Sequence, residues 1–302
     1  MAVGRSRSAD GNQVGYVVGE DFRPVAGASS TLDLLSRAGE PGSPAPFSAD
    51  LPVDWSPSLR DCVGFLDHVR NARRSRDVLD ELPPQWFDRP AFYFANPASL
   101  HAPQEPVAIP TGCERFDFEF EVAAVLTSGG VNLTAAEAAA CIGGYVLYCD
   151  WSARDIQSEE RVMQIGQGKG KDGAVSLGPW ILTAAEAEAL RREDGLDIDA
   201  TVTINDEVVL HTPFLGMDWS FEELVAYASL GAGVQAGDLI ASGTVPGGCL
   251  MESSHSTDFR GWLQPGDQVV LDGGPLGAIS TRITDPLPPV AWRRTTALHT
   301  PA

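Results

Sequence analysis

Residues 116–126 read FDFEFEVAAVL, a strand pattern that changes character half-way along. Side chains alternate across a strand, so the phenylalanines at 116, 118 and 120 share one face, and Asp117, Glu119 and Glu121 share the other. This half alone is typical of an amphipathic strand with a solvated face. The apolar run that follows Glu121 indicates a strand that enters a core and carries its carboxylates inward. Such a cluster predicts a hard-cation site, since Mg²⁺ and Ca²⁺ take oxygen ligands.

A second pattern lies upstream of this strand. Ser58 can cap a helix with Asp61 in its first turn, and apolar residues continue the helix to about Arg73. Asp61 and His68 are seven residues apart, so on a helix both lie on one face. With both side chains on one face, Asp61 could bind a metal ion while His68 beside it transfers a proton. A surface helix with unrelated charges would have the same pattern.

The rest of the chain has the helix caps and turn residues that are typical of a strand-rich fold. Capping patterns predict short helices that open after Thr134, Thr183 and Ser220. Turn pairs such as Asn205-Asp206 separate short strands in the C-terminal half. Residues 38–50 are rich in Pro, Gly, Ser and Ala, which predicts a linker after a small N-terminal β element.

Composition limits the classes of partner. The 302 residues carry a formal net charge of -20, which argues against nucleic acid and membrane surfaces. A small acidic substrate stays possible, because a bound cation can reverse the local potential. The five cysteines are odd in number and show no CxxC spacing, which indicates reduced thiols rather than a disulfide framework or a zinc site. With no run of signal-peptide or membrane-span length, we expect a cytoplasmic protein.

Several ordered motifs together carry a family resemblance. Residues 149–157, CDWSARDIQ, follow a predicted strand and resemble the signature of the fumarylacetoacetate hydrolase family. FDFEFEVAAVL, KGKDGAVSLGPWILT (169–183) and AGDLIASGTVPGGCLMES (236–253) resemble its glutamate strand, lysine loop and Gly-Thr turn. The resemblance implies a mixed α+β, β-rich fold with a rolled β-sandwich (β-roll) catalytic domain. We expect that domain at 51–290, a small N-terminal β element and linker at 1–50, and an irregular tail at 291–302.

The resemblance also implies roles for individual residues. The metal ligands would be Asp61, Glu119, Glu121 and Asp150. The proton-transfer pair would be His68 as general base and Glu252 as the acid that orients it. The groups that stabilise an oxyanion would be Lys171, Gln157 and Arg154, with an ion pair to Asp155 as the alternative role of Arg154. Substrate contacts would come from Tyr93, Arg76, Thr244 and Arg161. The cation implied is Mg²⁺, with Mn²⁺ or Ca²⁺ also compatible with carboxylate oxygens.

The reaction that these roles imply is hydrolysis of a carbon–carbon bond in a 1,3-diketone or acylpyruvate, by water activated by the His/Glu pair. An oxo-acid decarboxylase or tautomerase could use the same metal site without an activated water. A metal-dependent nuclease is disfavoured by the net charge and by the lack of a basic stripe. A non-catalytic metal-binding or scaffold protein is the remaining alternative. The resemblance implies a homodimer.

Three positions depart from the family pattern. Val175 stands where the lysine loop usually carries threonine, and Gly173 stands where related chains often carry phenylalanine. Arg161 occupies the place of a substrate-contacting tyrosine. We expect all three near the pocket, and therefore a substrate other than fumarylacetoacetate that is larger or more anionic.

Overall fold

Eleven strands form the largest of the three sheets in the computed structural model, which describes residues 1–289 except 10 and 165. The tail predicted at 291–302 lies outside the described residues. In chain order the strands of this sheet are β1 (Ala2–Ser6), β2 (Gln13–Val18), β3 (Asp21–Pro24), β4 (Leu59–Cys62), β5 (Phe92–Ala95), β6 (Leu100–His101), β9 (Phe120–Leu126), β10 (Ile142–Asp150), β12 (Val175–Leu177), β13 (Trp180–Thr183) and β17 (Leu239–Ala241). Nine of them follow one another in the order β3-β2-β1-β13-β10-β9-β17-β4-β5, while β12 pairs with β10 and β6 pairs with β12.

The second sheet has six strands and a short ladder lies beside it. The six are β7 (Val107–Ala108), β14 (Arg191–Arg192), β15 (Gly195–Ile204), β16 (Glu207–Leu215), β18 (Gln268–Asp272) and β19 (Ala278–Thr284), and the ladder joins β8 (Phe116–Asp117) to β11 (Ser152–Ala153). The hairpin between β15 and β16 turns at Asn205 and Asp206, both at positive φ, as the turn pair predicts.

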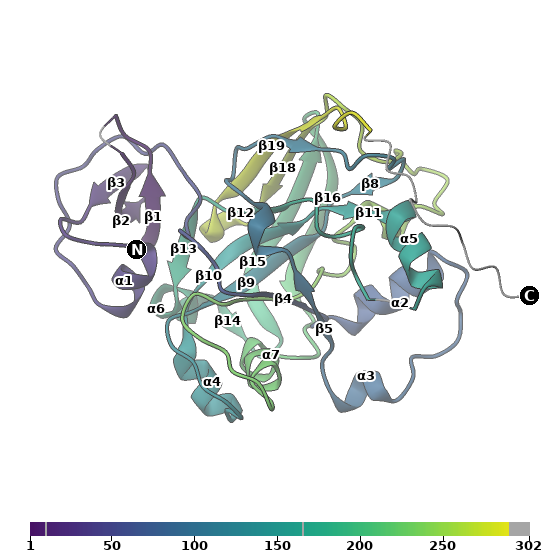
Figure 1. Ribbon diagram of the computed structural model, residues 1–302, viewed down its shortest axis with the longest axis horizontal. Coiled ribbons are helices and arrows are strands. Elements are labelled where there is room, and N and C mark those ends of the chain that lie inside the picture. The colour runs from purple at the N-terminus through teal and green to yellow at the C-terminus, as the bar shows by residue number, and fades with distance from the viewer. Residues whose placement is uncertain (10, 165, 290–302) are drawn as a thin grey trace, which may run out of the picture.

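The described helices are short and lie around the sheets (Figure 1). They are α1 (Thr31–Ser36), α2 (Leu66–Arg74), α3 (Gln85–Asp88), α4 (Ala135–Cys141), α5 (Arg154–Val162), α6 (Ala184–Ala187) and α7 (Phe221–Ala228), with 3-10 turns η1 (Pro97–Ser99), η2 (Glu188–Leu190), η3 (Leu250–Ser253) and η4 (Gly274–Leu276). The three predicted helix starts are confirmed, since Thr134, Thr183 and Ser220 each accept a hydrogen bond at the N-terminus of α4, α6 and α7. The β-rich mixed α+β class is therefore confirmed.

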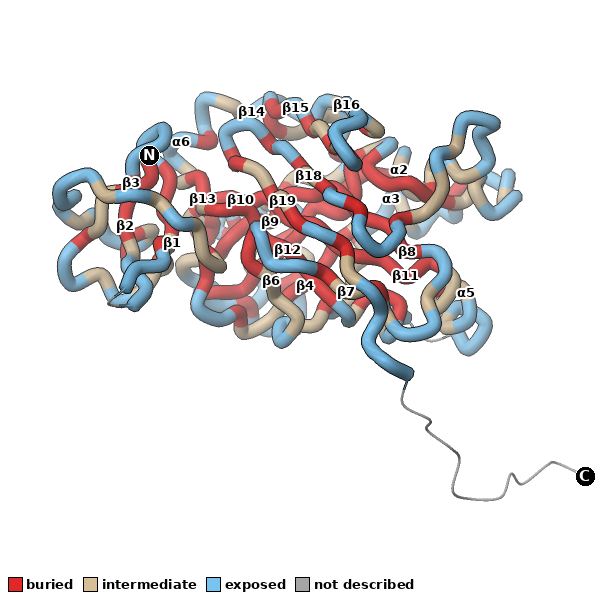
Figure 2. Tube along the Cα trace, turned by 90° about the horizontal axis from the view of Figure 1, so that it is seen from above, coloured by how far each residue is buried: buried red, intermediate tan, exposed pale blue. Residues whose placement is uncertain are grey.

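The central strand β9 is buried on both faces. Val122, Ala124 and Leu126 pack into the core between the two sheets, together with residues of β15, β18 and β19. Ala123 and Val125 point to the opposite face and pack with a smaller apolar cluster that α1 helps to cover. Figure 2 shows this buried centre in red, with exposed loops around it. A strand enclosed on both sides explains why the sequence from 122 to 126 is continuously apolar.

The N-terminal element joins the larger sheet directly. Strand β1 pairs antiparallel with β13, with Ala2 opposite Leu182. Residues 38–50, expected as a linker, run back along strands β1 to β3 through single bridges, such as the one between Phe22 and Ala45. Figure 1 shows this lobe at the end of the molecule opposite α2 and α5.

The helix expected from Ser58 to Arg73 is wrong at its start. Residues 59–62 form strand β4, which lies between β17 and β5, and the helix begins only at Leu66. Tertiary pairing overrides the local capping pattern here, because β4 is buried along its whole length. Asp61 and His68 therefore lie on different elements rather than on one helical face.

The strand expected from 116 to 122 is interrupted. It divides into β8 and β9 around residues 118 and 119, and Asp117, Glu119 and Glu121 are all buried. The alternative of a solvated carboxylate face is therefore wrong.

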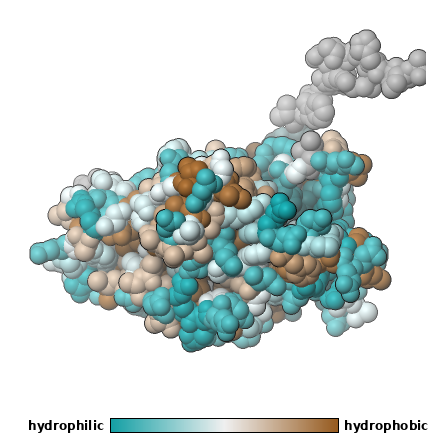
Figure 3. Space-filling view, turned by 90° about the horizontal axis from the view of Figure 1, so that it is seen from below, coloured by the Kyte–Doolittle hydropathy of each residue, from teal (hydrophilic) through white to brown (hydrophobic). Residues whose placement is uncertain are grey.

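The outer surface is mixed. Figure 3 shows a face that is largely hydrophilic, with hydrophobic residues gathered in separate patches. Among the described residues, no helix combines the length and the apolar character needed to cross a membrane.

Candidate active site

Three buried carboxylates meet where neighbouring strands of the larger sheet end. Asp61 lies in β4, Glu121 in β9 and Asp150 at the end of β10. Strand β17 brings the first two together, because Ala241 pairs with Asp61 on one side and with Ala123 on the other. Their ligand oxygens all lie within 4.8 Å of one another. The site thus depends on pairing between segments that are far apart in the sequence.

The electrostatics of this trio fit a divalent cation. Burial and the neighbouring carboxylates raise the pKa of Asp61 and of Glu121 well above their ordinary values. Burial and the nearby Glu119 raise the pKa of Asp150 to about 6, although Lys171 opposes that shift. One oxygen of Asp150, Oδ1, is buried without a hydrogen-bond partner among the described residues. A cation with oxygen preference would relieve this crowding and occupy the free oxygen, so the donors present suit Mg²⁺, Mn²⁺ or Ca²⁺.

The fourth expected ligand, Glu119, is held differently. Its carboxylate accepts a hydrogen bond from the ammonium group of Lys171, and its Oε1 lies 2.8 Å from Nη2 of Arg154. Burial opposes ionisation, but these two cations lower the pKa of Glu119 below its ordinary value. Lys171 also donates to Asp150, and the two carboxylates raise its pKa although burial favours the neutral amine. The structure therefore gathers three of the four expected ligands, with Glu119 next to them in an ion-pair network.

Backbone and hydroxyl donors fix the trio from the other side. Gly243 N–H donates to Oε2 of Glu121 at 3.1 Å, and the Thr244 hydroxyl donates to Oε1 at 3.3 Å. Gly243 has a φ of +80°, and a Cβ there would lie 2.3 Å from the carbonyl oxygen of Cys62. Only glycine allows this close approach. The Tyr93 hydroxyl donates to Asp61 at 3.1 Å and also to Asp150, so it positions carboxylates as well as facing the pocket.

A histidine–glutamate pair faces the carboxylates. Nδ1 of His68, on α2, lies 2.7 Å from Oε1 of Glu252, on η3. Glu252 is fixed in turn by Asn71 at 2.6 Å and by the Gly247 N–H at 2.9 Å. Nε2 of His68 lies 4.0 Å from Glu119. Because Nδ1–H donates to a carboxylate, Nε2 is the nitrogen that can accept a proton.

Helix α5 presents one polar face to the same space. Arg154, Gln157 and Arg161 are three and four residues apart, so they share that face. Arg154 is held by Asp117, whose Oδ2 lies 2.8 Å from its Nε and Nη2. The alternative pairing of Arg154 with Asp155 is wrong, because Asp155 instead accepts the N–H of residue 114.

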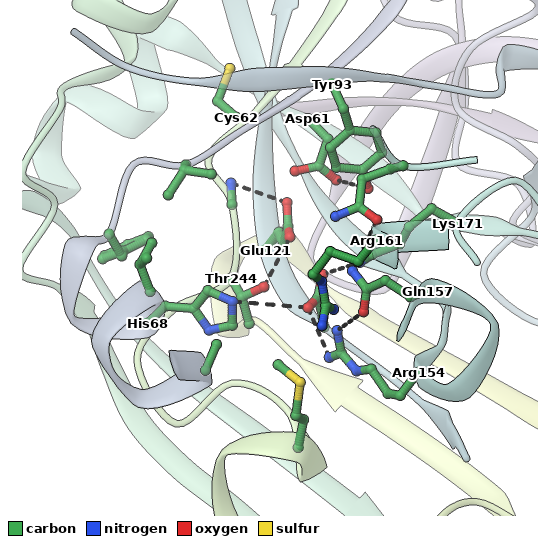
Figure 4. A pocket seen from close by; sticks show the side chains of 18 of the residues that line it. Asp61, Cys62, His68, Tyr93, Glu121, Arg154, Gln157, Arg161, Lys171 and Thr244 are labelled. Carbon is green, nitrogen blue, oxygen red and sulfur yellow. Dashed lines mark hydrogen bonds and ion pairs between the residues drawn. The ribbon is translucent and has the colours of Figure 1, made fainter. Parts of the chain in front are cut away.

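These groups line one cavity of about 220 Å³. Figure 4 shows His68 on one side of it and the α5 residues on the other, with Glu121 and Thr244 between them. The expected site residues on its wall are Asp61, His68, Arg76, Tyr93, Glu119, Glu121, Arg154, Gln157, Arg161, Lys171 and Thr244. Asp150 and Glu252 stand behind the wall and contact those that form it.

Sequence reasoning missed some of the cavity. Cys62, Trp86 and Gln167 line it, and Gln167 accepts a hydrogen bond from Gln157 at 3.0 Å. Only Gln167 had a usable signal, since it stands in the Gly-rich loop just before Lys171.

Two of the three departures from the family pattern lie outside the cavity wall. Arg161 lines the cavity, but Val175 is buried in the apolar cluster beside β10, and Gly173 is exposed near Pro110. All three were expected near the pocket: Arg161 lines it, whereas Val175, which pairs with Asp150 across β10 and β12, and Gly173, two residues after Lys171, lie near it without forming its wall. A changed substrate must therefore be argued from Arg161.

The family model described as fumarylacetoacetate (FAA) hydrolase C-terminal matches residues 59–284 of the chain. The chain belongs to the fumarylacetoacetate hydrolase family. The resemblance of its motifs is thereby confirmed, and the matched range holds every residue of the site described above.

Relatives within this family carry out different reactions. The chain is 27% identical over 269 residues to a fumarylacetoacetase from Arabidopsis thaliana, covering 70% of this chain and 64% of the relative. It is 28% identical over 234 residues to the human mitochondrial oxaloacetate tautomerase FAHD2B, covering 77% and 68%. A fumarylpyruvate hydrolase from Pseudomonas aeruginosa, solved with Mn²⁺ and pyruvate, has a similar fold, with a TM-score of 0.61 and 18% identity over 89% of this chain and 98% of that one. Membership of this family indicates an enzyme without fixing hydrolysis or isomerisation.

Proposed function

We propose that the protein is a metal-dependent hydrolase that cleaves a carbon–carbon bond in a 1,3-diketone or acylpyruvate-type oxo-acid. The observation that carries this proposal is the pair of His68 and Glu252, at 2.7 Å, facing the three carboxylates across one cavity. A bound divalent cation would supply Lewis acidity toward the substrate's oxygens. The residues that would hold it are Asp61, Glu121 and Asp150, with Glu119 adjacent.

The general base of this proposal is Nε2 of His68. Glu252 accepts the Nδ1 proton and so keeps Nε2 free to take a proton from water in the cavity. Two further donors to Glu252, Asn71 and Gly247, hold the carboxylate in place. The pair therefore has a fixed orientation before substrate enters.

Positive groups opposite the base suit the charge that develops on the attacked carbonyl oxygen. Lys171 and Arg154 are buried and ion-paired with carboxylates, and both reach the cavity wall. They are already neutralised in part by Glu119, which keeps them ordered. Preorganised cations of this kind stabilise an oxyanion without reorganisation.

A second candidate function is tautomerisation or decarboxylation of an oxo-acid. It is favoured by the similarity to an oxaloacetate tautomerase, and it would need the same carboxylates but no activated water. The non-catalytic alternative has less support, because a solvent-connected cavity brings base, cations and carboxylates together.

The deciding experiment is turnover of a panel of acylpyruvates, diketones and oxaloacetate after EDTA treatment, with Mg²⁺ or Mn²⁺ added back. The proposal expects two fragments per turnover, restored by metal, and a fall in kcat of about 10²–10⁴-fold in His68→Ala. Metal-dependent enol–keto exchange or CO₂ release that survives His68→Ala would favour the second candidate.

The expected homodimer and cytoplasmic location stay predictions. Light scattering of the purified protein tests the first, and fractionation of the source cells tests the second.

A further inference from the structure

Three side chains of different ligand type meet behind the cavity wall on which His68 lies. They are His68, Cys249 and Glu252. Their ligand atoms are a ring nitrogen, a thiol sulfur and a carboxylate oxygen, and all three lie within 4.8 Å of one another. This cluster shares no residue with the carboxylate trio, and its cysteine has no part in the proposed reaction. The thiol therefore needs an explanation of its own.

Local structure explains why a cysteine lies beside the base. Cys249 directly precedes the 3-10 turn η3, and Glu252 is the third residue of that turn. Side chains three positions apart in such a turn lie on one side, so the thiol and the carboxylate point the same way. Ala72, four residues after His68 on α2, belongs to one apolar cluster with Cys249 and Met251. The sulfur is thus held against the face of α2 that carries the base.

One oxygen of Glu252 is the centre of the cluster. Its Oε1 lies 2.7 Å from Nδ1 of His68, and it also accepts a hydrogen bond from the thiol of Cys249 at 3.7 Å. The other oxygen, Oε2, is held by Asn71 and by the Gly247 N–H. A ring N–H and an S–H therefore point at the same atom from two sides, and one cation can replace both protons.

The distances within the cluster suit zinc. Tetrahedral Zn²⁺ binds nitrogen, oxygen and sulfur at about 2.0–2.3 Å, which places neighbouring ligand atoms roughly 3.3–3.6 Å apart. The sulfur of Cys249 and Oε1 of Glu252 are already 3.7 Å apart. Nδ1 and Oε1, now 2.7 Å apart, must separate by a small rotation of the ring or the carboxylate. Because His68 lines the cavity, water from that space can fill the fourth position.

The ligand types distinguish this cluster from the carboxylate trio. The trio offers only oxygens, which suit Mg²⁺ and Mn²⁺, whereas imidazole and thiolate favour Zn²⁺. Burial raises the pKa of the Cys249 thiol well above its ordinary value, so the zinc-free protein holds a neutral thiol. Zinc must displace that proton, as it does at other cysteine sites. A protein saturated with Mg²⁺ can therefore still bind zinc here.

We propose that His68, Cys249 and Glu252 form a second metal site, which binds Zn²⁺ and thereby inhibits the enzyme. Zinc takes the place of the proton on Nδ1, and the neutral ring then carries its proton on Nε2. The thiol proton leaves to solvent, so one proton is released for each zinc bound. With Nε2 protonated, His68 can no longer accept a proton from water. The inhibitory effect rests on the proposed function, whereas the metal site does not.

The first test needs no substrate. The protein is saturated with Mg²⁺ and titrated with Co²⁺, a spectroscopic substitute for zinc. A thiolate bound to Co²⁺ gives a near-ultraviolet charge-transfer band, and the oxygens of the trio cannot produce it. We expect this band in the native protein. Excess Zn²⁺ should remove it and excess Mg²⁺ should not.

Variants show which thiol binds. Cys249→Ala should abolish the band and weaken zinc binding, measured by calorimetry, by more than the roughly 10–100-fold that loss of an outer-shell partner costs. Cys249→Ser is a second variant in case the first is unstable, and His68→Ala should weaken zinc binding as well. The control is Cys62→Ser, since Cys62 lines the cavity beside Asp61, and it should keep the band. Circular dichroism verifies that each variant is folded.

Inhibition is measured on the Mg²⁺-loaded protein with an oxo-acid that it turns over. Saturating Zn²⁺ should lower kcat by about 10²–10⁴-fold, the contribution of a general base, and should change KM little. A nitrogen chelator that removes zinc and leaves Mg²⁺ bound should restore the rate. Each cysteine variant is compared with its own zinc-free rate, and the Cys249 variants should lose the inhibition.

The absence of a thiolate band, or a band that survives Cys249→Ala, would overturn the inference. Zinc inhibition that excess Mg²⁺ relieves would also overturn it, because the zinc would then lie in the carboxylate trio. A band that depends on Cys249, without cleavage of any oxo-acid, would keep the metal site and reject the proposed reaction. Metal-dependent cleavage without the band would do the reverse.

Discussion

Asp117 connects helix α5 to the 3-10 turn η3. Its buried carboxylate binds Arg154 at 2.8 Å and accepts the N–H groups of Leu250 and Met251 at 2.8 and 3.0 Å. Removing it leaves a buried guanidinium without one of its partners. Asp117→Ala should therefore lower the free energy of unfolding by about 3–5 kcal/mol, measured by urea denaturation. Asp67→Ala, which breaks an exposed pair with Arg70, is the control and should change it by less than about 1 kcal/mol.

The carboxylate trio predicts a particular pH dependence for the metal-free protein. Its acids have raised pKa values in the fold, so the folded state binds protons more tightly than the unfolded chain. The contribution of Asp150 to stability is thus present below the ordinary pKa of an aspartate and is lost as pH rises through about 6, and those of Asp61 and Glu121 are lost well above the ordinary range of a carboxyl group, since burial raises their pKa. Metal must displace these protons.

We therefore expect the thermal stabilisation by Mg²⁺ to be larger at neutral pH than at mildly acidic pH, with proton release on binding. Calorimetry in buffers of different ionisation enthalpy measures that release. A metal affinity that is independent of pH across this range would contradict the assignment of the trio as ligands.

At the scale of elements, the base depends on how helix α2 is anchored. The residue before the helix, Phe65, provides no side-chain cap, and Asp218 from a distant loop accepts the N–H of Leu66 at 2.7 Å instead. Asp218→Ala should cost about 1 kcal/mol of stability. It should also lower kcat more than it changes KM, because His68 sits in the first turn of α2.

The control for this prediction is Thr134→Ala, which removes the cap of α4 far from the cavity. A similar loss of stability with unchanged kcat is expected there. If both variants lower kcat equally, the effect is one of general stability and α2 has no special positioning role.

Some helices and strands could be predicted from the sequence and others could not. Caps at residues 134, 183 and 220 were predictable because their signals are local. The strand at 59–62 was not, because it forms by pairing with β17, about 180 positions later in the chain. Because Asp61 lies in this strand and His68 in a helix, the prediction that both share one helical face was wrong. The roles expected of these two residues therefore rest on the motif resemblance. The cavity beside the carboxylate trio combines residues from several separate segments, so no single stretch of sequence predicts all of its wall.

For the whole molecule, the pairing of β1 with β13 makes the N-terminal lobe part of one sheet. Val3 and Phe22 are fully buried, and α1 packs over the face of β10. Deleting residues 1–50 would expose the edge of β13 and the apolar cluster under α1. We expect the shortened protein to melt at a lower temperature and to aggregate, measured by differential scanning fluorimetry and light scattering. An unchanged melting temperature would instead support an independent catalytic domain at 51–290.

The parallel pairing of β4 with β17, with β9 on the other side of β17, has a kinetic consequence. The three strands β4, β9 and β17 come from the first, middle and last thirds of the chain. The metal ligands therefore come together only after long loops have closed. A cation therefore has no preformed cage in the unfolded chain or in early folding intermediates. Mg²⁺ should slow unfolding while leaving the refolding rate nearly unchanged, and the bound ion would then extend the lifetime of the native state without guiding the route to it.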